Sequence, residues 1–261
     1  MQKKQLTTTG LICLEDDYHI VYKVAKIEYK EWEDGTFKYV FIPFYNVIEM
    51  LPDRLFQGIP GLDLSLKKAV YERNNIVPTF ISERTPDEHR EDVRDLMEEL
   101  GLQSLNRLEW LVRTDKRYSG DKLFVMPYDG KDYVTYVEHS MYDLVKKSDS
   151  IYKKLLEIIC MGDYLYADDL TIDDDSRTHY YNILMPIYMH EYNKKKLSKD
   201  IGIDRAKENN VYQGRRRIKI DPLLLNKIAD DYLHGTTSAE KAAAQLKISK
   251  ATFFRRLKEL Q

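Results

Sequence analysis

The C-terminal stretch Asp221–Gln261, DPLLLNKIADDYLHGTTSAEKAAAQLKISKATFFRRLKELQ, decides how the last part of this chain folds. Asp221 followed by Pro222 is typical of a helix start, because an aspartate side chain caps free backbone N–H groups and proline suits the first helical position. Apolar residues then recur at helical spacing until Gly235, which predicts that the helix ends there. The apolar stripe consists of Leu224, Leu225, Ile228, Ala229 and Leu233.

Two shorter helices are predicted after this one. Ser238 is the expected cap of the first, in which Ala242 and Ala243 are small enough to allow close helix packing. Ser249 is the expected cap of the second, with Phe253, Leu257 and Leu260 on its apolar side. The last two helices have the spacing of a helix-turn-helix, a unit that lays its final helix in the DNA major groove.

The charge of the chain is divided unevenly. Residues 201–261 contain 13 Lys or Arg and 7 Asp or Glu. Residues 1–200 contain 28 Lys or Arg and 36 Asp or Glu. Arg215, Arg216 and Arg217 stand just before the first helix of the tail, where an extended basic arm can enter a minor groove. A solvated linker is the alternative for this run, so DNA binding depends on its combination with the cations of the third helix.

Two motifs in residues 195–261 resemble the C-terminal region of the serine recombinases, the resolvases and invertases. GIDRAKENNVYQGRRR, from Gly202, is similar to the end of that family's long helix and its arm, although Asn210 stands where glycine is usual. Ile248, Ser249, Thr252, Phe254 and Arg255 match its recognition helix. The resemblance implies that Gly214 and Arg215 lie in the minor groove and that Lys250, Ala251 and Arg255 face bases. It also implies that Ser249, Thr252 and Phe254 approach phosphates.

The candidate DNA contacts combine this resemblance with the basic residues around it. They are Gly214, Arg215, Arg216, Arg217, Ser249, Lys250, Ala251, Thr252, Phe254, Arg255 and Arg256.

The resemblance does not extend to recombinase chemistry. That family needs a serine nucleophile after its first strand, and the first serine here is Ser65. Residues 35–125, which include FISERTPDEHREDVRDLMEELGL from Phe80, weakly resemble the N-terminal subdomain of HipA-type toxin kinases. No phosphate-cradling Gly-rich loop or kinase catalytic loop follows, so this likeness implies a protein-interaction module.

The rest of the chain predicts an α+β body. A hairpin is expected around Asp34–Gly35 and a second around Asp129–Gly130, with a helix beginning at Thr85 and a polar loop over 171–178. The predicted organisation is an α+β domain of unassigned activity at 1–178, a long connecting helix at 179–210 and a three-helix helix-turn-helix domain at 211–261. Apolar residues of the long helix are expected to pair two copies: Met185, Ile187, Met189 and Tyr192.

We therefore expect a sequence-specific double-stranded DNA-binding protein of the bacterial cytoplasm, a homodimer that regulates or maintains a mobile element or phage. The alternatives are a divergent recombinase or nuclease with the same tail, and a HipA-like module that binds a second protein. No catalytic residue, cofactor or metal is predicted, because Cys13 and Cys160 lack ligand spacing and the acidic run at 168–175 lacks the pattern of a calcium loop. The apolar runs are too short to predict a membrane span.

Overall fold

The computed structural model describes residues 4–114, 117–118, 120–145, 150–209 and 218–260. The chain divides into two compact units, residues 1–197 and residues 198–261. This division falls inside the long helix, beyond the boundary at 178 that the sequence suggests.

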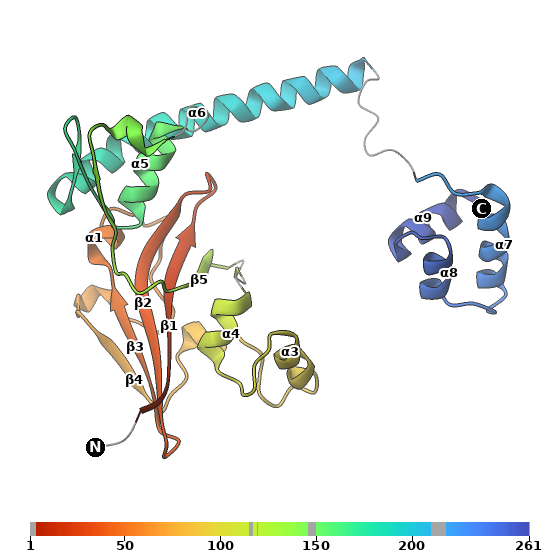
Figure 1. Cartoon of the computed structure of the whole chain (residues 1–261), viewed down its shortest axis with the longest axis horizontal. Coiled ribbons are helices and arrows are strands. Elements are labelled where there is room, and N and C mark those ends of the chain that lie inside the picture. The colour runs from red at the N-terminus through yellow and green to blue at the C-terminus, as the bar shows by residue number, and fades with distance from the viewer. Residues whose placement is uncertain (1–3, 115–116, 119, 146–149, 210–217, 261) are drawn as a thin grey trace. The chain divides into compact units, whose positions relative to one another are not determined.

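The first unit is built on a five-stranded antiparallel sheet (Figure 1). The strands lie in the order β4-β3-β2-β1-β5. Their bounds are β1 Lys4–Glu15, β2 Val21–Trp32, β3 Phe37–Pro43, β4 Tyr71–Asn74 and β5 Leu123–Pro127. The predicted hairpin around Asp34–Gly35 is confirmed: Gly35 has a φ of +79°, and the Trp32 amide donates to the Thr36 carbonyl at 3.0 Å. Glycine adopts this left-handed conformation without a steric penalty.

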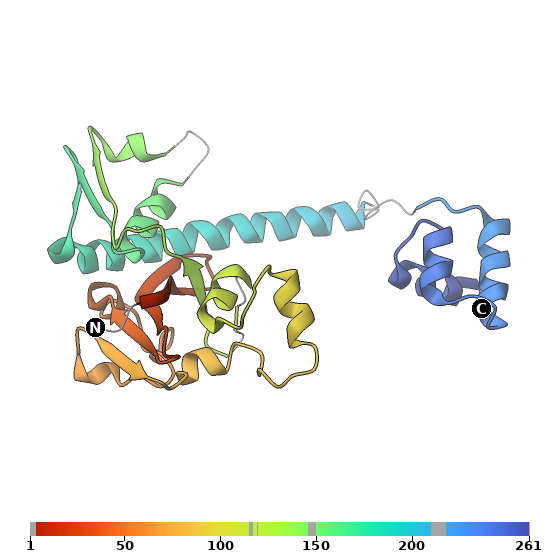
Figure 2. The ribbon, with the colours of Figure 1, turned by 60° about the horizontal axis from the view of Figure 1, so that its bottom comes forward.

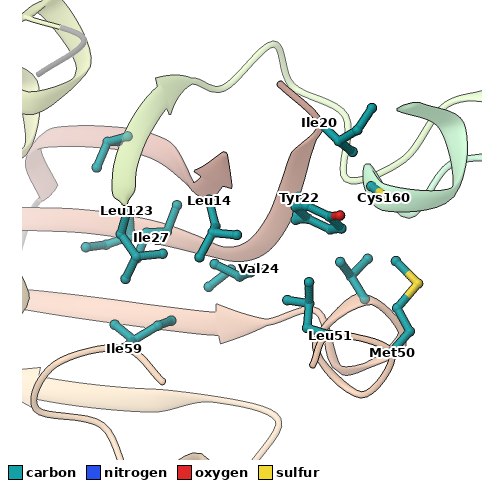
Figure 3. Close-up of a cluster of buried hydrophobic side chains, with 14 of the residues drawn as sticks. Leu14, Ile20, Tyr22, Val24, Ile27, Met50, Leu51, Ile59, Leu123 and Cys160 are labelled. Carbon is teal, nitrogen blue, oxygen red and sulfur yellow. The ribbon is translucent and has the colours of Figure 1, made fainter. Parts of the chain in front are cut away.

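The main hydrophobic core lies on one face of this sheet. Figure 3 shows Leu14 from β1 and Val24 and Ile27 from β2, together with Met50 and Leu51 from the segment that follows β3. Leu14, Val24 and Ile27 are fully buried, so β1 and β2 contribute a large share of the buried apolar area that stabilises the unit.

Five short helices accompany the sheet in the described part of the first unit. They are α1 Tyr45–Ile48, α2 Thr79–Ser82, α3 Val93–Glu99, α4 Arg107–Thr114 and α5 Ile151–Cys160, with 3₁₀ turns at Leu64–Leu66 and Met141–Leu144. Helix α4 packs on β1 and β5, and α1 and α5 pack on β2. The helix expected from Thr85 begins only at Val93. Tertiary bonds explain the difference, because Arg107 donates to the Thr85 hydroxyl at 3.0 Å and to the Pro86 carbonyl at 2.7 Å.

The second hairpin prediction, around Asp129–Gly130, is wrong. Strand β5 pairs with β1, whereas β6 (Thr135–Glu138) pairs in parallel with β7 (Tyr164–Ala167) in a separate sheet that β8 (Thr171–Ile172) completes. Asp132 holds the intervening segment away from a hairpin, since its carboxylate accepts from Lys26 at 2.6 Å and from the Tyr128 hydroxyl at 3.0 Å.

The polar stretch at 171–178 is not a loop. It contains β8 and the start of α6, which runs from Asp174 to Glu208 as one helix (Figure 1). Asp173 and Ser176 form a reciprocal cap: the Asp173 carboxylate accepts from the Ser176 amide, and the Ser176 hydroxyl accepts from the Asp173 amide, both at 2.9 Å. The acidic residues therefore begin the helix, where negative charge is favoured.

The α+β class of the body, the long helix and the helices of the tail are confirmed. The tail contains α7 (Pro222–Leu233), α8 (Ala239–Gln245) and α9 (Lys250–Leu260), which Figure 2 shows gathered into a small bundle. None of the helices in the described ranges combines the length and the apolar character that crossing a membrane requires.

Candidate nucleic-acid interface

Local capping fixes the first helix of the tail. The Asp221 carboxylate accepts from the Leu223 amide at 3.0 Å, and Pro222 occupies the first turn. At the other end Gly235 adopts a φ of +75°, and the Thr236 amide donates to the Asp231 carbonyl at 2.9 Å. Both ends of α7 therefore lie where the sequence places them.

The turn between α8 and α9 positions the start of α9. Lys247 has a φ of +54°, and the Ile248 amide donates to the Ala243 carbonyl at 3.0 Å, which closes α8 in a Schellman-type cap. The Ser249 hydroxyl accepts from the Thr252 amide at 3.2 Å and lies 2.9 Å from the Thr252 hydroxyl. Ser249 and Thr252 are thus engaged in starting α9, as the sequence predicts for Ser249.

A small apolar core holds the three helices together. Phe253 of α9 is fully buried and packs edge-on against Tyr232 of α7, with ring centroids 5.4 Å apart. Ala242 and Ala243 of α8 are buried beside it, so their small side chains let α8 and α9 approach closely. This core fixes the rotation of α9 about its axis and so determines which side chains face outward.

The outward side of α9, called here the outer face, carries five exposed residues at helical spacing: Lys250, Ala251, Phe254, Arg255 and Lys258. Four of these are among the candidate DNA contacts. Arg255 and Lys258 make no ion pair with any residue that the structure describes. The outer face therefore presents two cations without an ion pair to a described residue, beside a small residue and an aromatic ring. The exposed Glu259, four residues after Arg255, lies next to them and pairs with Arg256.

Arg256 lies on a different side of α9. Its side chain is only 13% exposed, pairs with Glu259 at 2.9 Å and donates to the Ile218 carbonyl at 3.2 Å. Arg256 therefore joins α9 to the segment before α7 and does not share the outer face.

Lys250 is paired with Glu240 of α8. The hydrogen bond from Lys250 lowers the pKa of the Glu240 carboxyl. Because Glu240 already compensates this ammonium group, Lys250 contributes less positive potential to the outer face than Arg255 does.

Lys258 was not among the candidate DNA contacts. It stands seven residues after Ala251 and four after Phe254, and this spacing alone places it on the same helical face. Gly214, Arg215, Arg216 and Arg217, the predicted arm, lie outside the described residues.

The body contains a separate buried charged cluster. Arg177 of α6, 1% exposed, donates to the carbonyls of Ile159 and Asp163 at 2.9 Å each, and Lys23 lies 3.8 Å from the Asp163 carboxylate. Burial raises the pKa of the Asp163 carboxyl and lowers that of the Lys23 ammonium. The cluster joins β2, α5 and α6, so it has a structural use.

Metal ligands do not gather in the described part of the chain, where no group of three or more His, Cys, Asp or Glu side chains is placed to hold an ion. Several of the acidic residues 168–175 instead accept hydrogen bonds within the body; Asp169, for example, accepts from the Ser140 hydroxyl at 2.7 Å and from the Met141 amide at 2.9 Å.

Comparison with known proteins supplies no family for this chain. No protein-family model matches the chain, and no curated protein matches it either.

Proposed function

We propose that this chain is a sequence-specific double-stranded DNA-binding protein. In this proposal α8 and α9 act as a helix-turn-helix, the outer face of α9 lies in the major groove, and Arg215–Arg217 enter the adjacent minor groove.

One observation carries the proposal: the outer face of α9 holds Arg255 and Lys258, neither of which forms an ion pair with a described residue, while Phe253 on the opposite side is buried in the bundle. An arginine at this position of a recognition helix can bond to guanine O6 and N7. Ala251, one turn earlier, has a small side chain that lets the helix approach the bases closely. Its methyl group can contact a thymine methyl group. The positive balance of residues 201–261 adds attraction to phosphates.

A homodimer on paired half-sites belongs to the same proposal, because one small module makes few base contacts. The residues that the sequence suggested for pairing are mostly engaged elsewhere: Met185 is buried, and Met189 and Tyr192 pack against the core of the body. A different row of α6 is open to a partner. Its members recur at intervals of four, ten and four residues and are all exposed by more than two fifths: Ile183, Ile187, Leu197 and Ile201.

The alternative functions differ in what the body does: it performs DNA chemistry, binds a second protein, or does neither. A divergent recombinase or nuclease requires a nucleophile or a metal site, and the first serine, Ser65, is engaged with Asp63 at the start of a 3₁₀ turn. A HipA-like interaction module remains a proposal for residues 35–125, with a second protein as its partner. A regulator or maintenance factor of a mobile element or phage, which performs no DNA chemistry, is the function that we favour.

The full-length protein tests this proposal directly. Selection from a random double-stranded DNA library should enrich one motif, and fluorescence anisotropy should then show binding at least about 10³-fold tighter than to a scrambled duplex. Equal affinity for the two duplexes would contradict sequence-specific binding. A supercoiled plasmid that carries the motif, incubated with the protein and Mg²⁺, distinguishes the enzyme alternative from a regulator. Nicks, covalent adducts or rearranged product would identify a recombinase or nuclease.

A further inference from the structure

The N-terminal unit contains a cavity of about 490 Å³ that the DNA-binding proposal does not use. It lies between the loop that joins β1 to β2, the segment around Pro52–Leu55 and the first half of α6. Its volume is in the range of cavities that hold small organic ligands. All of its lining residues belong to the first unit.

Most of the charged side chains around this cavity are already engaged in hydrogen bonds or ion pairs. The Asp16 carboxylate accepts from the amides of Tyr18 and Ile20 and from the Tyr22 hydroxyl, at 2.8 to 2.9 Å. Asp17 pairs with Lys122 at 2.6 Å.

Arg54 is the exception. It lines the same cavity, and within the described ranges no carboxylate pairs with it. Its side chain is exposed; burial raises the pKa of the Tyr181 hydroxyl, and the Arg54 charge opposes this rise only slightly. An arginine without a partner beside a cavity is suited to a planar anionic group such as a carboxylate.

The walls of the cavity suit an aromatic ligand. Leu55, Met185 and Met189 contribute apolar side chains, and methionine thioethers adapt their shape to a ring and make favourable contacts with it. Pro186 and Asn182 also line the space. Since proline has no N–H, it cannot donate to the Asn182 carbonyl one turn earlier, so this stretch of α6 lacks one helical bond beside the cavity.

One tyrosine hydroxyl of the lining, that of Tyr181, adds a polar group that can accept from a ligand. The Tyr22 hydroxyl donates to Asp16 and lies 3.3 Å from the Tyr181 hydroxyl. Because the Tyr22 proton is used by Asp16, Tyr181 is the donor between the two, and its oxygen keeps the capacity to accept a bond from a ligand.

We propose that this cavity binds a small aromatic monoanion, with Arg54 as the counter-charge of its carboxylate and Met185 and Met189 against its ring. This site is independent of the tail, so its failure would leave the DNA-binding proposal untouched.

The probe for the test is 1-naphthoate, with the uncharged 1-naphthamide as its matched control, each titrated into the full-length protein by calorimetry. The carboxylate should bind about tenfold or more tightly than the amide, because a hydrogen bond to a charged group is stronger than its neutral counterpart. Arg54→Gln should remove this preference. The control Arg94→Gln changes an exposed arginine of α3 away from the cavity and should preserve the preference.

A second pair of variants tests the location. Asn182→Trp should block the cavity because Asn182 is exposed and lines it, whereas His179→Trp, at an exposed position of the same helix outside the lining, should leave naphthoate binding unchanged. The proposal is overturned if naphthoate and naphthamide bind equally, if Asn182→Trp leaves binding intact, or if naphthoate binds more weakly than about 1 mM.

Discussion

The ammonium group of Lys250, at the first position of α9, forms an ion pair with the carboxylate of Glu240 in α8. Both side chains are more than half exposed, so water screens the pair and its contribution to stability is small. Its importance concerns availability, because bound DNA must compete with Glu240 for the same ammonium group.

Glu240→Gln should therefore strengthen DNA binding. The change frees Lys250 and removes a negative charge near the proposed path of the phosphate backbone. We expect an increase in affinity of about two- to fivefold, in keeping with the free energy of an exposed ion pair. Anisotropy titrations over a range of salt concentrations measure it, with Glu98→Gln on the exposed side of α3 as the matched control. Unchanged affinity would mean that Lys250 lies away from the DNA.

Arg255 and Lys258 should differ in the kind of binding that they support. Arg255→Ala should relax the preference at one base pair and cost about 1–3 kcal/mol on the cognate site. Lys258→Ala, farther along α9, should weaken binding to all sequences alike and reduce the salt slope by about one. Competition titrations against duplexes with single base changes measure both effects. If Arg255→Ala weakens every duplex equally, Arg255 contacts only phosphate.

Arg215→Ala tests the predicted arm. An arginine in a minor groove attracts the phosphates on both sides, so its loss should lower affinity and make binding less dependent on salt. The measurement is the slope of log affinity against log salt concentration. Lys67→Ala in the body is the control, because its ammonium is 70% exposed and engaged with Glu49. A variant with wild-type affinity and slope would exclude the arm from the interface.

The features of the tail that could be predicted are those set by neighbouring residues. Asp221, Ser238 and Ser249 each bond to an amide two or three residues later, so the start of each helix is visible in the sequence. The rotation of α9 follows equally from Phe253 and Leu257. The inward position of Arg256 does not follow, because it depends on the Ile218 carbonyl, 38 residues away.

The errors in the body have different physical causes. Thr135 of β6 pairs in parallel with Tyr164 of β7, and no pattern of neighbouring residues predicts such a distant pairing. Asp129–Gly130 does form a turn, with φ of +91° at the glycine, but the chain after it joins another sheet. The cap at Asp173 and Ser176 joins residues three positions apart, so it could have been predicted. It was not, because the surrounding acidic residues favoured the interpretation as a polar loop.

The exposed row on α6 should control dimerisation. Leu197→Lys places a charge where the proposed partner would bury an apolar side chain, so the variant should be monomeric, with a mass of 30.9 kDa by light scattering. Cognate DNA affinity should fall with it, because two half-sites are no longer bound together. The control is Leu66→Lys, since Leu66 is 56% exposed on a 3₁₀ turn of the body. A wild-type protein that is itself monomeric at micromolar concentration and on DNA would contradict the dimer.

Alkaline pH should lower the free energy of unfolding of the body, because the body contains buried thiols. Burial raises the pKa of Cys13 from 9.0 to about 12, and that of Cys160 also rises. A group whose pKa is higher in the folded state stabilises that state fully below its unfolded pKa, and the contribution is lost as pH rises through the folded pKa. Between about pH 9 and pH 12, the Cys13 thiol should therefore reduce the free energy of unfolding by up to about 1.4 kcal/mol per pH unit, and Cys160 should act in the same direction.

Cys13→Ala isolates the contribution of one thiol. Urea unfolding of the variant and the wild type at pH 8 and pH 10 gives two differences in the free energy of unfolding, and the variant's decrease should be smaller by about 1 kcal/mol. Tyrosines such as Tyr39, whose pKa burial raises to about 12, affect both proteins equally and cancel in the comparison. Because Cys13 is fully buried in the sheet, a thiol reagent should also leave it unmodified in the native protein at pH 8. Rapid modification of Cys13 without unfolding, or identical pH dependence in the two proteins, would show that β1 opens to solvent in the native state.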